Sequence, residues 1–197
     1  MKQRRIGIYS GTFNPVHAGH VSFALQALKE AKLDKVYLMP ERYRAHKIDV
    51  AHYGHRIAMV RQAIKPHRNL GIIENSDVTF SVAKTLPKLK NQFNDAKLVF
   101  LMGSDTLSNL PQWEGVKHLL KGSELVIGVR EGDEQAITSW LAALPIKPSA
   151  VHQIASLKPA VSSTKVREAL RRDEHTDGIL PSVRRYSNRN WLYISLA

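Results

Sequence analysis

The N-terminal segment 6–28 most constrains the fold, because its pattern predicts one strand, one tight turn and one helix. Residues 6–9 (IGIY) are a short apolar run, typical of a strand buried on both faces. Residues 21–28 (VSFALQAL) carry apolar side chains at helical spacing. The connecting segment 11–20 (GTFNPVHAGH) therefore lies between the carboxyl end of a strand and the start of a helix, where α/β proteins bind anionic ligands.

The rest of the chain repeats this alternation. Further strands are predicted at 35–40, 70–74, 97–102, 124–129 and 150–154, and helices at 53–65, 82–93, 116–120 and 135–144. Alternating elements predict βαβ units in a mostly parallel sheet. The segments 11–20, 40–47, 103–105 and 130–132 then meet at one edge of that sheet.

We expect the C-terminal portion, about 160–190, to belong to the same domain as the rest of the chain. At 197 residues the chain has room for one sizeable core, so we expect a single domain over 1–197. Hydroxyl residues open a helix near 162, and a last helix is predicted over 180–188, beginning at Pro181. The apolar tail 191–194 (WLYI) is expected to form an edge strand or to contact a partner.

Composition narrows the class of protein. The chain has no cysteine, which excludes disulfides, thiolate metal sites and a cysteine nucleophile. No segment approaches the ~18 apolar residues of a spanning helix and no signal peptide is evident, so we expect a soluble, cytoplasmic protein without membrane contact. Lys and Arg number 29 against 17 Asp and Glu, and the resulting charge of +12 attracts polyanions. Nucleic acid is the usual partner of such a charge, and the alternative is a basic surface that keeps the protein soluble or attracts a small phosphorylated substrate.

Segment 11–20 carries groups suited to phosphate chemistry. Its glycine-containing turn lets the backbone approach phosphate oxygens, and the helix N-terminus adds the positive end of a dipole. His17 and His20 add donors that can follow charge as it develops on a phosphoryl group. The alternative is a turn with two incidental histidines.

Segment 11–20 resembles the signature of the nucleotidyltransferase superfamily with a (T/H)xGH motif, and is most similar to that of bacterial nicotinate-mononucleotide adenylyltransferases. The resemblance implies an α/β fold: a Rossmann-like, doubly wound, mostly parallel sheet with helices on both faces. It also implies that His17 and His20 are catalytic and contact the ATP phosphates. The other residues of the motif that are expected to bind ATP are Gly11, Thr12, Phe13 and Gly19.

Residues 162–167 (SSTKVR) resemble the second motif of the same family, SSTxxR. The resemblance implies that Ser162, Ser163 and Thr164 hold the ATP phosphates and that Arg167 neutralises them during catalysis. The physical fit is good, because hydroxyls and helix N-terminal amides form an anion cradle with Arg167 one turn inside the helix. A capped surface helix is the alternative.

Three further matches concern the nucleoside and acceptor sites. Gly103 and Asp105 lie in a segment that resembles the family's G-(A/S)-D, which contacts the ATP ribose; N-capping by Asp105 is the alternative. Trp113 lies near the family's aromatic residue that stacks on the pyridine ring, although a core tryptophan is equally typical. His46 and Lys47 resemble the family's Pro-His-Lys/Arg loop, which reaches the substrate phosphate; otherwise they belong to a solvated basic loop.

Two departures concern the acceptor half of the site. Where the family usually has Ser-Tyr-Thr, this chain has TFSV at 79–82. Where the family usually has Arg-Pro-Gly, it has REG at 130–132. Arg130 is retained, and we expect it to contact the acceptor. Nicotinate mononucleotide is the leading acceptor, and nicotinamide mononucleotide or a small phosphorylated acceptor such as phosphopantetheine remains open. A nucleic-acid-binding or regulatory protein on an inactive transferase fold would explain the charge of +12, whereas intact His17 and His20 favour an enzyme.

The implied reaction is attack by the acceptor phosphate on the α-phosphorus of ATP, with release of pyrophosphate. A phosphate monoester has its second pKa near 6, so at pH 7 it is already an anion and needs no general base. Mg²⁺ would arrive with ATP and keep most of its waters, so no dedicated metal site is expected on the protein. The expected partners are ATP and a pyridine mononucleotide, nucleic acid is not expected as the main partner, and the chain is compatible with a homo-oligomer.

Overall fold

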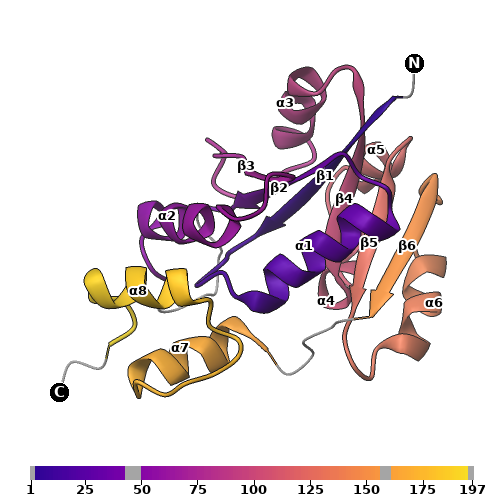
Figure 1. Ribbon diagram of the computed structural model, residues 1–197. Helices are drawn as coiled ribbons and strands as arrows, with labels where there is room; N and C mark the ends of the chain where they lie inside the picture. The colour runs from indigo at the N-terminus through magenta and orange to yellow at the C-terminus, as the bar shows by residue number, and fades with distance from the viewer. Residues whose placement is uncertain (1–2, 43–49, 156–160, 195–197) are drawn as a thin grey trace.

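The computed structural model describes residues 3–42, 50–155 and 161–194, in which six strands form one parallel sheet (Figure 1). The strands are β1 (Arg4–Gly11), β2 (Lys35–Pro40), β3 (Leu70–Ile72), β4 (Ala96–Gly103), β5 (Glu124–Val129) and β6 (Ala150–Ala155). Their order is β3-β2-β1-β4-β5-β6, and each neighbouring pair runs parallel. The strand order therefore reverses at β1, which places a crevice at its carboxyl end.

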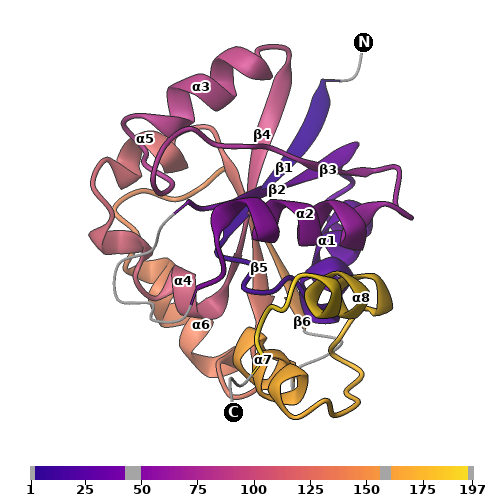
Figure 2. The ribbon, with the colours of Figure 1, turned by 90° about the vertical axis from the view of Figure 1, so that its left-hand side faces the viewer.

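Helices cover both faces of the sheet (Figure 2). One face packs against α1 (Ala18–Glu30), α2 (Tyr53–Ile64), α7 (Ser163–Arg171) and α8 (Pro181–Arg189). The other packs against α3 (Thr85–Gln92), α4 (Ser104–Leu107), α5 (Val116–Leu120) and α6 (Glu134–Ala142), with the short 3₁₀ helix η1 (Leu110–Gln112) between α4 and α5. The expected doubly wound α/β fold is confirmed.

Strand β4 shows why the strands read as continuous apolar runs. Phe100 and Met102 belong to one core layer, whereas Val99 and Leu101, which alternate with them, belong to the other. Successive side chains of a strand point to opposite faces, and here both faces are covered by helices. The sequence pattern of an interior parallel strand follows directly from this burial.

Two predicted elements differ in the structure. Helix α3 begins at Thr85 and not near residue 82, which places Pro87 in its first turn, where the missing amide donor costs little. The tail does not extend the sheet: residues 191–194 have no strand, and Tyr193 is buried against the core beside α8. Among the described residues, no helix has the length and apolar character needed to cross a bilayer.

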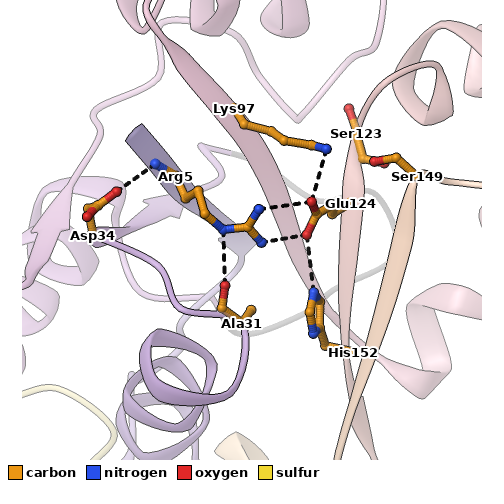
Figure 3. Close-up of polar contacts among 8 residues, drawn as sticks. All are labelled: Arg5, Ala31, Asp34, Lys97, Ser123, Glu124, Ser149 and His152. Carbon is orange, nitrogen blue, oxygen red and sulfur yellow. Dashed lines mark hydrogen bonds and ion pairs between the residues drawn. The ribbon is translucent and has the colours of Figure 1, made fainter. Parts of the chain in front are cut away.

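An ion cluster at the amino edge of the sheet ties four strands together (Figure 3). Glu124 at the start of β5 accepts two hydrogen bonds from the Arg5 guanidinium, at 3.0 and 2.6 Å. Lys97 Nζ lies 3.0 Å from one of its oxygens, and His152 Nε2 lies 3.1 Å from the other. These partners come from β1, β4 and β6, and their hydrogen bonds hold the pKa of Glu124 at about 2. The cluster is structural and lies at the edge opposite the crevice.

Candidate active site

A pocket of about 700 Å³ opens at the carboxyl edge of the sheet, where β1, β4 and β5 end. It has the size of a site for a cofactor or nucleotide. All predicted site residues in the described part of the chain line it: Gly11, Thr12, Phe13, His17, Gly19, His20, Gly103, Asp105, Trp113, Arg130, Ser162, Ser163, Thr164 and Arg167. His46 and Lys47 lie outside the described residues. The topology therefore brings together segments that are up to about 150 residues apart in sequence.

The two motif histidines form a stacked pair at the start of α1. Their ring centroids are 3.6 Å apart, and the ring planes differ by 28°. The backbone N–H of His17 donates to His20 Nδ1 at 3.2 Å, so the neutral His20 ring carries its proton on Nε2. Burial lowers the pKa of His17 to about 4, so this ring is neutral at pH 7 in the free protein. Before a ligand binds, His17 therefore acts as a neutral hydrogen-bonding group.

Gly19 is required by the position of the His17 ring. A Cβ atom on residue 19 would lie 3.1 Å from both Cε1 and Nδ1 of His17, closer than ordinary van der Waals contact. The ring therefore packs directly over the backbone of the first helical turn. This contact explains why a glycine stands between the two histidines.

We expect Gly19→Ala to lower kcat/KM about 10- to 100-fold, because the added methyl displaces the His17 ring. The matched control is Gly54→Ala in the first turn of α2, where the added Cβ would meet His52 Nδ1 at an ordinary 3.5 Å. Both changes favour helix formation, by up to ~1 kcal/mol each. Steady-state kinetics and thermal unfolding of the two variants separate these effects. Equal activity of both variants would contradict the role assigned to Gly19.

Arg56 in α2 hydrogen-bonds to the turn between β1 and α1. This side chain is only 1% exposed, and its guanidinium donates to the carbonyl oxygens of Thr12, Arg42 and Ala51 at 2.6, 2.8 and 2.9 Å. Sequence reasoning missed this residue. The signal was present, because Arg56 occupies a position on the apolar stripe of α2 together with Met59 and Val60.

The second motif begins α7, as the sequence predicts, but its hydroxyls already have partners. Ser162 is the N-cap, and its side chain accepts from the Lys165 amide at 3.3 Å. Ser163 Oγ donates to the Pro15 carbonyl at 3.0 Å. Arg167 Nη1 donates to the Asn14 carbonyl at 2.9 Å. The second motif therefore binds the first motif directly, which aligns the two halves of the pocket.

Asp105 is not an N-cap, contrary to one of the two roles predicted for it. The N-cap of α4 is Gly103, and Asp105 lies in the first helical turn. Its carboxylate forms an ion pair with Arg130 at 3.1 Å across the ends of β4 and β5. A Cβ on Gly103 would approach Asp105 Oδ1 to 2.5 Å, so a larger residue there would displace this carboxylate. The carboxylate is exposed enough to receive a ligand, with its side chain 52% accessible.

Trp113 lies in the pocket and also packs on the core. Its ring centroid is 5.8 Å from that of Phe80, and both rings line the pocket wall. The two predicted roles of Trp113 are therefore compatible. Phe80 belongs to the TFSV segment that departs from the family pattern, so an aromatic wall survives that departure.

A second segment with the same pattern, His52-Tyr53-Gly54-His55, begins α2. His52 is the N-cap and accepts from the Gly54 amide at 3.3 Å. His55 Nδ1 lies 3.0 Å from the hydroxyl oxygen of Tyr186 in α8. Neither histidine is among the residues lining the pocket, as far as the described chain shows. The pattern alone does not define the site.

Comparison with known proteins agrees with this geometry. The sequence model of the cytidylyltransferase-like family matches residues 8–169, which include both motifs. This chain belongs to that family. A nicotinate-nucleotide adenylyltransferase of Bacillus subtilis (strain 168) is 31% identical over 201 residues, covering 98% of this chain and 100% of the relative. A probable nicotinate-nucleotide adenylyltransferase of Neisseria meningitidis (serogroup C) is 30% identical over 202 residues, covering 96% and 98%.

Solved structures show that this member of the cytidylyltransferase-like family shares its fold with distant relatives. Plasmodium falciparum nicotinic acid mononucleotide adenylyltransferase complexed with NaAD superposes with a TM-score of 0.81 at 19% identity. The match covers 98% of this chain and 100% of the other. At this identity the likeness concerns the fold.

Proposed function

We propose that the protein transfers the adenylyl group of ATP to nicotinate mononucleotide, forming nicotinate adenine dinucleotide and pyrophosphate for NAD synthesis. The observation that carries this proposal is the convergence of the histidine pair with Arg167 in one pocket. The names of the relatives that this chain matches along nearly its full length support the choice of acceptor.

The reaction is a displacement at phosphorus. An oxygen of the acceptor phosphate forms a bond to the α-phosphorus of ATP, and the bond from that phosphorus to the bridging oxygen of pyrophosphate breaks. The electron pair leaves with pyrophosphate. Because the acceptor phosphate is an anion at pH 7, the protein has to position the reactants and stabilise charge, and it needs no general base.

The histidine pair and Arg167 stabilise the negative charge of the phosphates in different ways. His20 offers Nε2–H, which its hydrogen bond from the His17 backbone keeps in the donating tautomer. His17 is neutral before binding, and the approach of phosphate favours its protonated form. Arg167 supplies permanent charge. We assign ATP-phosphate binding to two groups of residues that line the pocket: Gly11, Thr12, Phe13 and Gly19 from the first motif, and Ser162, Ser163 and Thr164 from the second.

The second substrate is the magnesium complex of ATP. Mg²⁺ with a nucleotide is usually held by one or two carboxylates, waters and phosphate oxygens. The described residues contain no cluster of three metal-ligating side chains, whereas Glu41 and Asp105 each bring a carboxylate to the pocket. This donor set fits an ion held mainly by the substrate. The ion would neutralise the departing pyrophosphate, and Asp105 also remains available to the ATP ribose.

Trp113, Phe80 and Arg130 lie on the part of the pocket that we assign to the acceptor. The aromatic wall suits a pyridine ring, and Arg130 supplies positive charge to the same pocket. His46 and Lys47 are expected to reach the acceptor phosphate.

The test is an acceptor panel with detection of pyrophosphate. With Mg²⁺ and ATP, we expect nicotinate mononucleotide to be used with a kcat/KM at least about tenfold above that of nicotinamide mononucleotide, a difference of ~1.4 kcal/mol in the barrier. With phosphopantetheine as the acceptor, no pyrophosphate should be released from ATP. A preference for nicotinamide mononucleotide would change the acceptor, and silence with every pyridine mononucleotide would refute the proposed reaction.

A further inference from the structure

The turn 14–18, which connects the ATP-facing loop to α1, is bound largely by the C-terminal part of the chain. Four hydrogen bonds cross between them. They join Gly178 O to the Ala18 amide at 3.0 Å, Ser163 Oγ to Pro15 O at 3.0 Å, Arg167 Nη1 to Asn14 O at 2.9 Å and Tyr193 Oη to Asn14 Oδ1 at 2.7 Å. The first comes from the connection between α7 and α8, and the second and third come from the second motif. The fourth comes from the tail, 179 residues away in sequence.

Asn14 is the junction of these contacts. It is 4% exposed, and its Oδ1 accepts from the Tyr193 hydroxyl and, at 3.0 Å, from the Ala51 amide. Its backbone carbonyl accepts from Arg167. A buried group with this arrangement has little freedom to move, because any shift breaks several hydrogen bonds at once. His17 follows only three residues later.

The backbone conformation of the tail places Tyr193 against Asn14. Trp191 and Tyr193 both have positive φ angles, of 52° and 62°, in a region that residues other than glycine rarely occupy. Their side chains have opposite environments, because Trp191 is 77% exposed and Tyr193 only 9% exposed. Strained backbone persists where the surrounding structure determines it. Here the burial of Tyr193 and its hydrogen bond to Asn14 maintain the unusual backbone of the tail.

We propose that Tyr193 is a positioning residue for adenylyl transfer, acting through Asn14 on the turn that presents His17 to the ATP phosphates. This inference rests on the proposed function for its kinetic readout. Tyr193 lies outside both sequence motifs, and it does not line the pocket. Its effect is therefore indirect: without the hydroxyl, Asn14 loses one of the donors that fix it. A displacement of about 1 Å at a reacting group can lower a rate 100-fold.

The test compares Tyr193→Phe with Tyr186→Phe. Tyr186 is a matched control, because its hydroxyl also hydrogen-bonds across elements, to His55 at 3.0 Å, and no hydrogen bond among the described residues joins it to the turn. Each variant loses one hydroxyl and the hydrogen bond described for it, so both melting temperatures should fall by a few degrees. We expect only Tyr193→Phe to lower kcat/KM for ATP, by about three- to tenfold. Equal kcat/KM in the two variants and the wild type would overturn the proposal.

A double-mutant cycle tests the route through Asn14. Asn14→Ala should lower kcat/KM more than Tyr193→Phe does, and combining the two should cost no more than Asn14→Ala alone. Additive losses would overturn a route through Asn14.

Calorimetry of the magnesium complex of ATP needs no acceptor, so it tests the role of Tyr193 independently of which acceptor the protein uses. If the wild type is inactive with all pyridine mononucleotides, the proposed function fails, while Tyr193→Phe should still raise the Kd for ATP about threefold or more. An unchanged Kd in that case would overturn the role of Tyr193 as well.

Discussion

Replacing His20 with alanine is expected to lower kcat about 100- to 1,000-fold, with a small effect on the KM for ATP. The reason is that Nε2–H of His20 is an oriented donor, held in the donating tautomer by the His17 backbone N–H at 3.2 Å. Such a donor acts mainly on charge that develops in the transition state. The measurement is steady-state pyrophosphate release at saturating acceptor.

Two companion variants separate catalysis from helix capping. His20→Asn retains an oxygen near the position of Nδ1, which can accept from the His17 amide, but places no donor where Nε2–H lies. We expect it to keep wild-type stability and to be as inactive as His20→Ala. His55→Ala changes the corresponding residue of the second His-x-Gly-His segment, whose contact is Tyr186, and should retain activity. Near-normal turnover of His20→Asn would show that the histidine is structural.

Replacing Glu124 with glutamine is expected to lower the free energy of unfolding by about 3 kcal/mol while leaving kcat unchanged. The change leaves the positive charges of Arg5 and Lys97 at the amino edge without their carboxylate. A typical domain has only about 5–15 kcal/mol of stability, so this loss is large. Asp95→Asn is the control: it removes the exposed ion pair with Arg4 from the same edge and should cost less than ~1 kcal/mol. Urea unfolding at pH 7 and 25 °C gives both values.

The same cluster predicts a pH dependence of stability. The pKa of Glu124 is about 2 in the folded protein, against an ordinary value of 4.5. Its contribution is therefore complete above about pH 4.5 and is lost as the pH falls toward 2, because the unfolded chain binds the proton first. The stability difference between wild type and Glu124→Gln should narrow over this interval. A difference that stays constant down to pH 2 would contradict the assignment.

Much of the fold could be predicted from local sequence, because the helices bury both faces of the sheet. Strands β2 and β5 have the predicted bounds, 35–40 and 124–129, since interior strands read as unbroken apolar runs. The start of α3 was harder to predict, because Pro87 is compatible with the first turn of a helix as well as with its end. The tail was assigned to an edge strand or a partner contact. Its apolar residues indicate burial, but they do not reveal the surface that receives them.

The residues of the candidate site also differ in whether local sequence predicts them. His17, His20 and Arg167 could be found because their motifs combine specific residues at fixed spacing next to a strand or a helix start. Arg56 and Tyr193 could not, since their partners are backbone carbonyls or a side chain distant in sequence. Asp105 illustrates the intermediate case: its place near the pocket was predicted, whereas its pairing with Arg130 required the neighbouring strand.

The sequence by itself determined the alternation of strands and helices, the two motifs and the phosphate chemistry they support, because these depend on residue types and short spacings. Only the tertiary structure decided which groups act together. Two segments read His-x-Gly-His, and both begin helices, yet one lines the pocket at the carboxyl end of β1 and the other packs against α8. The physical reason is that the crevice is made where the order of strands reverses, and only the first segment follows the strand at that point.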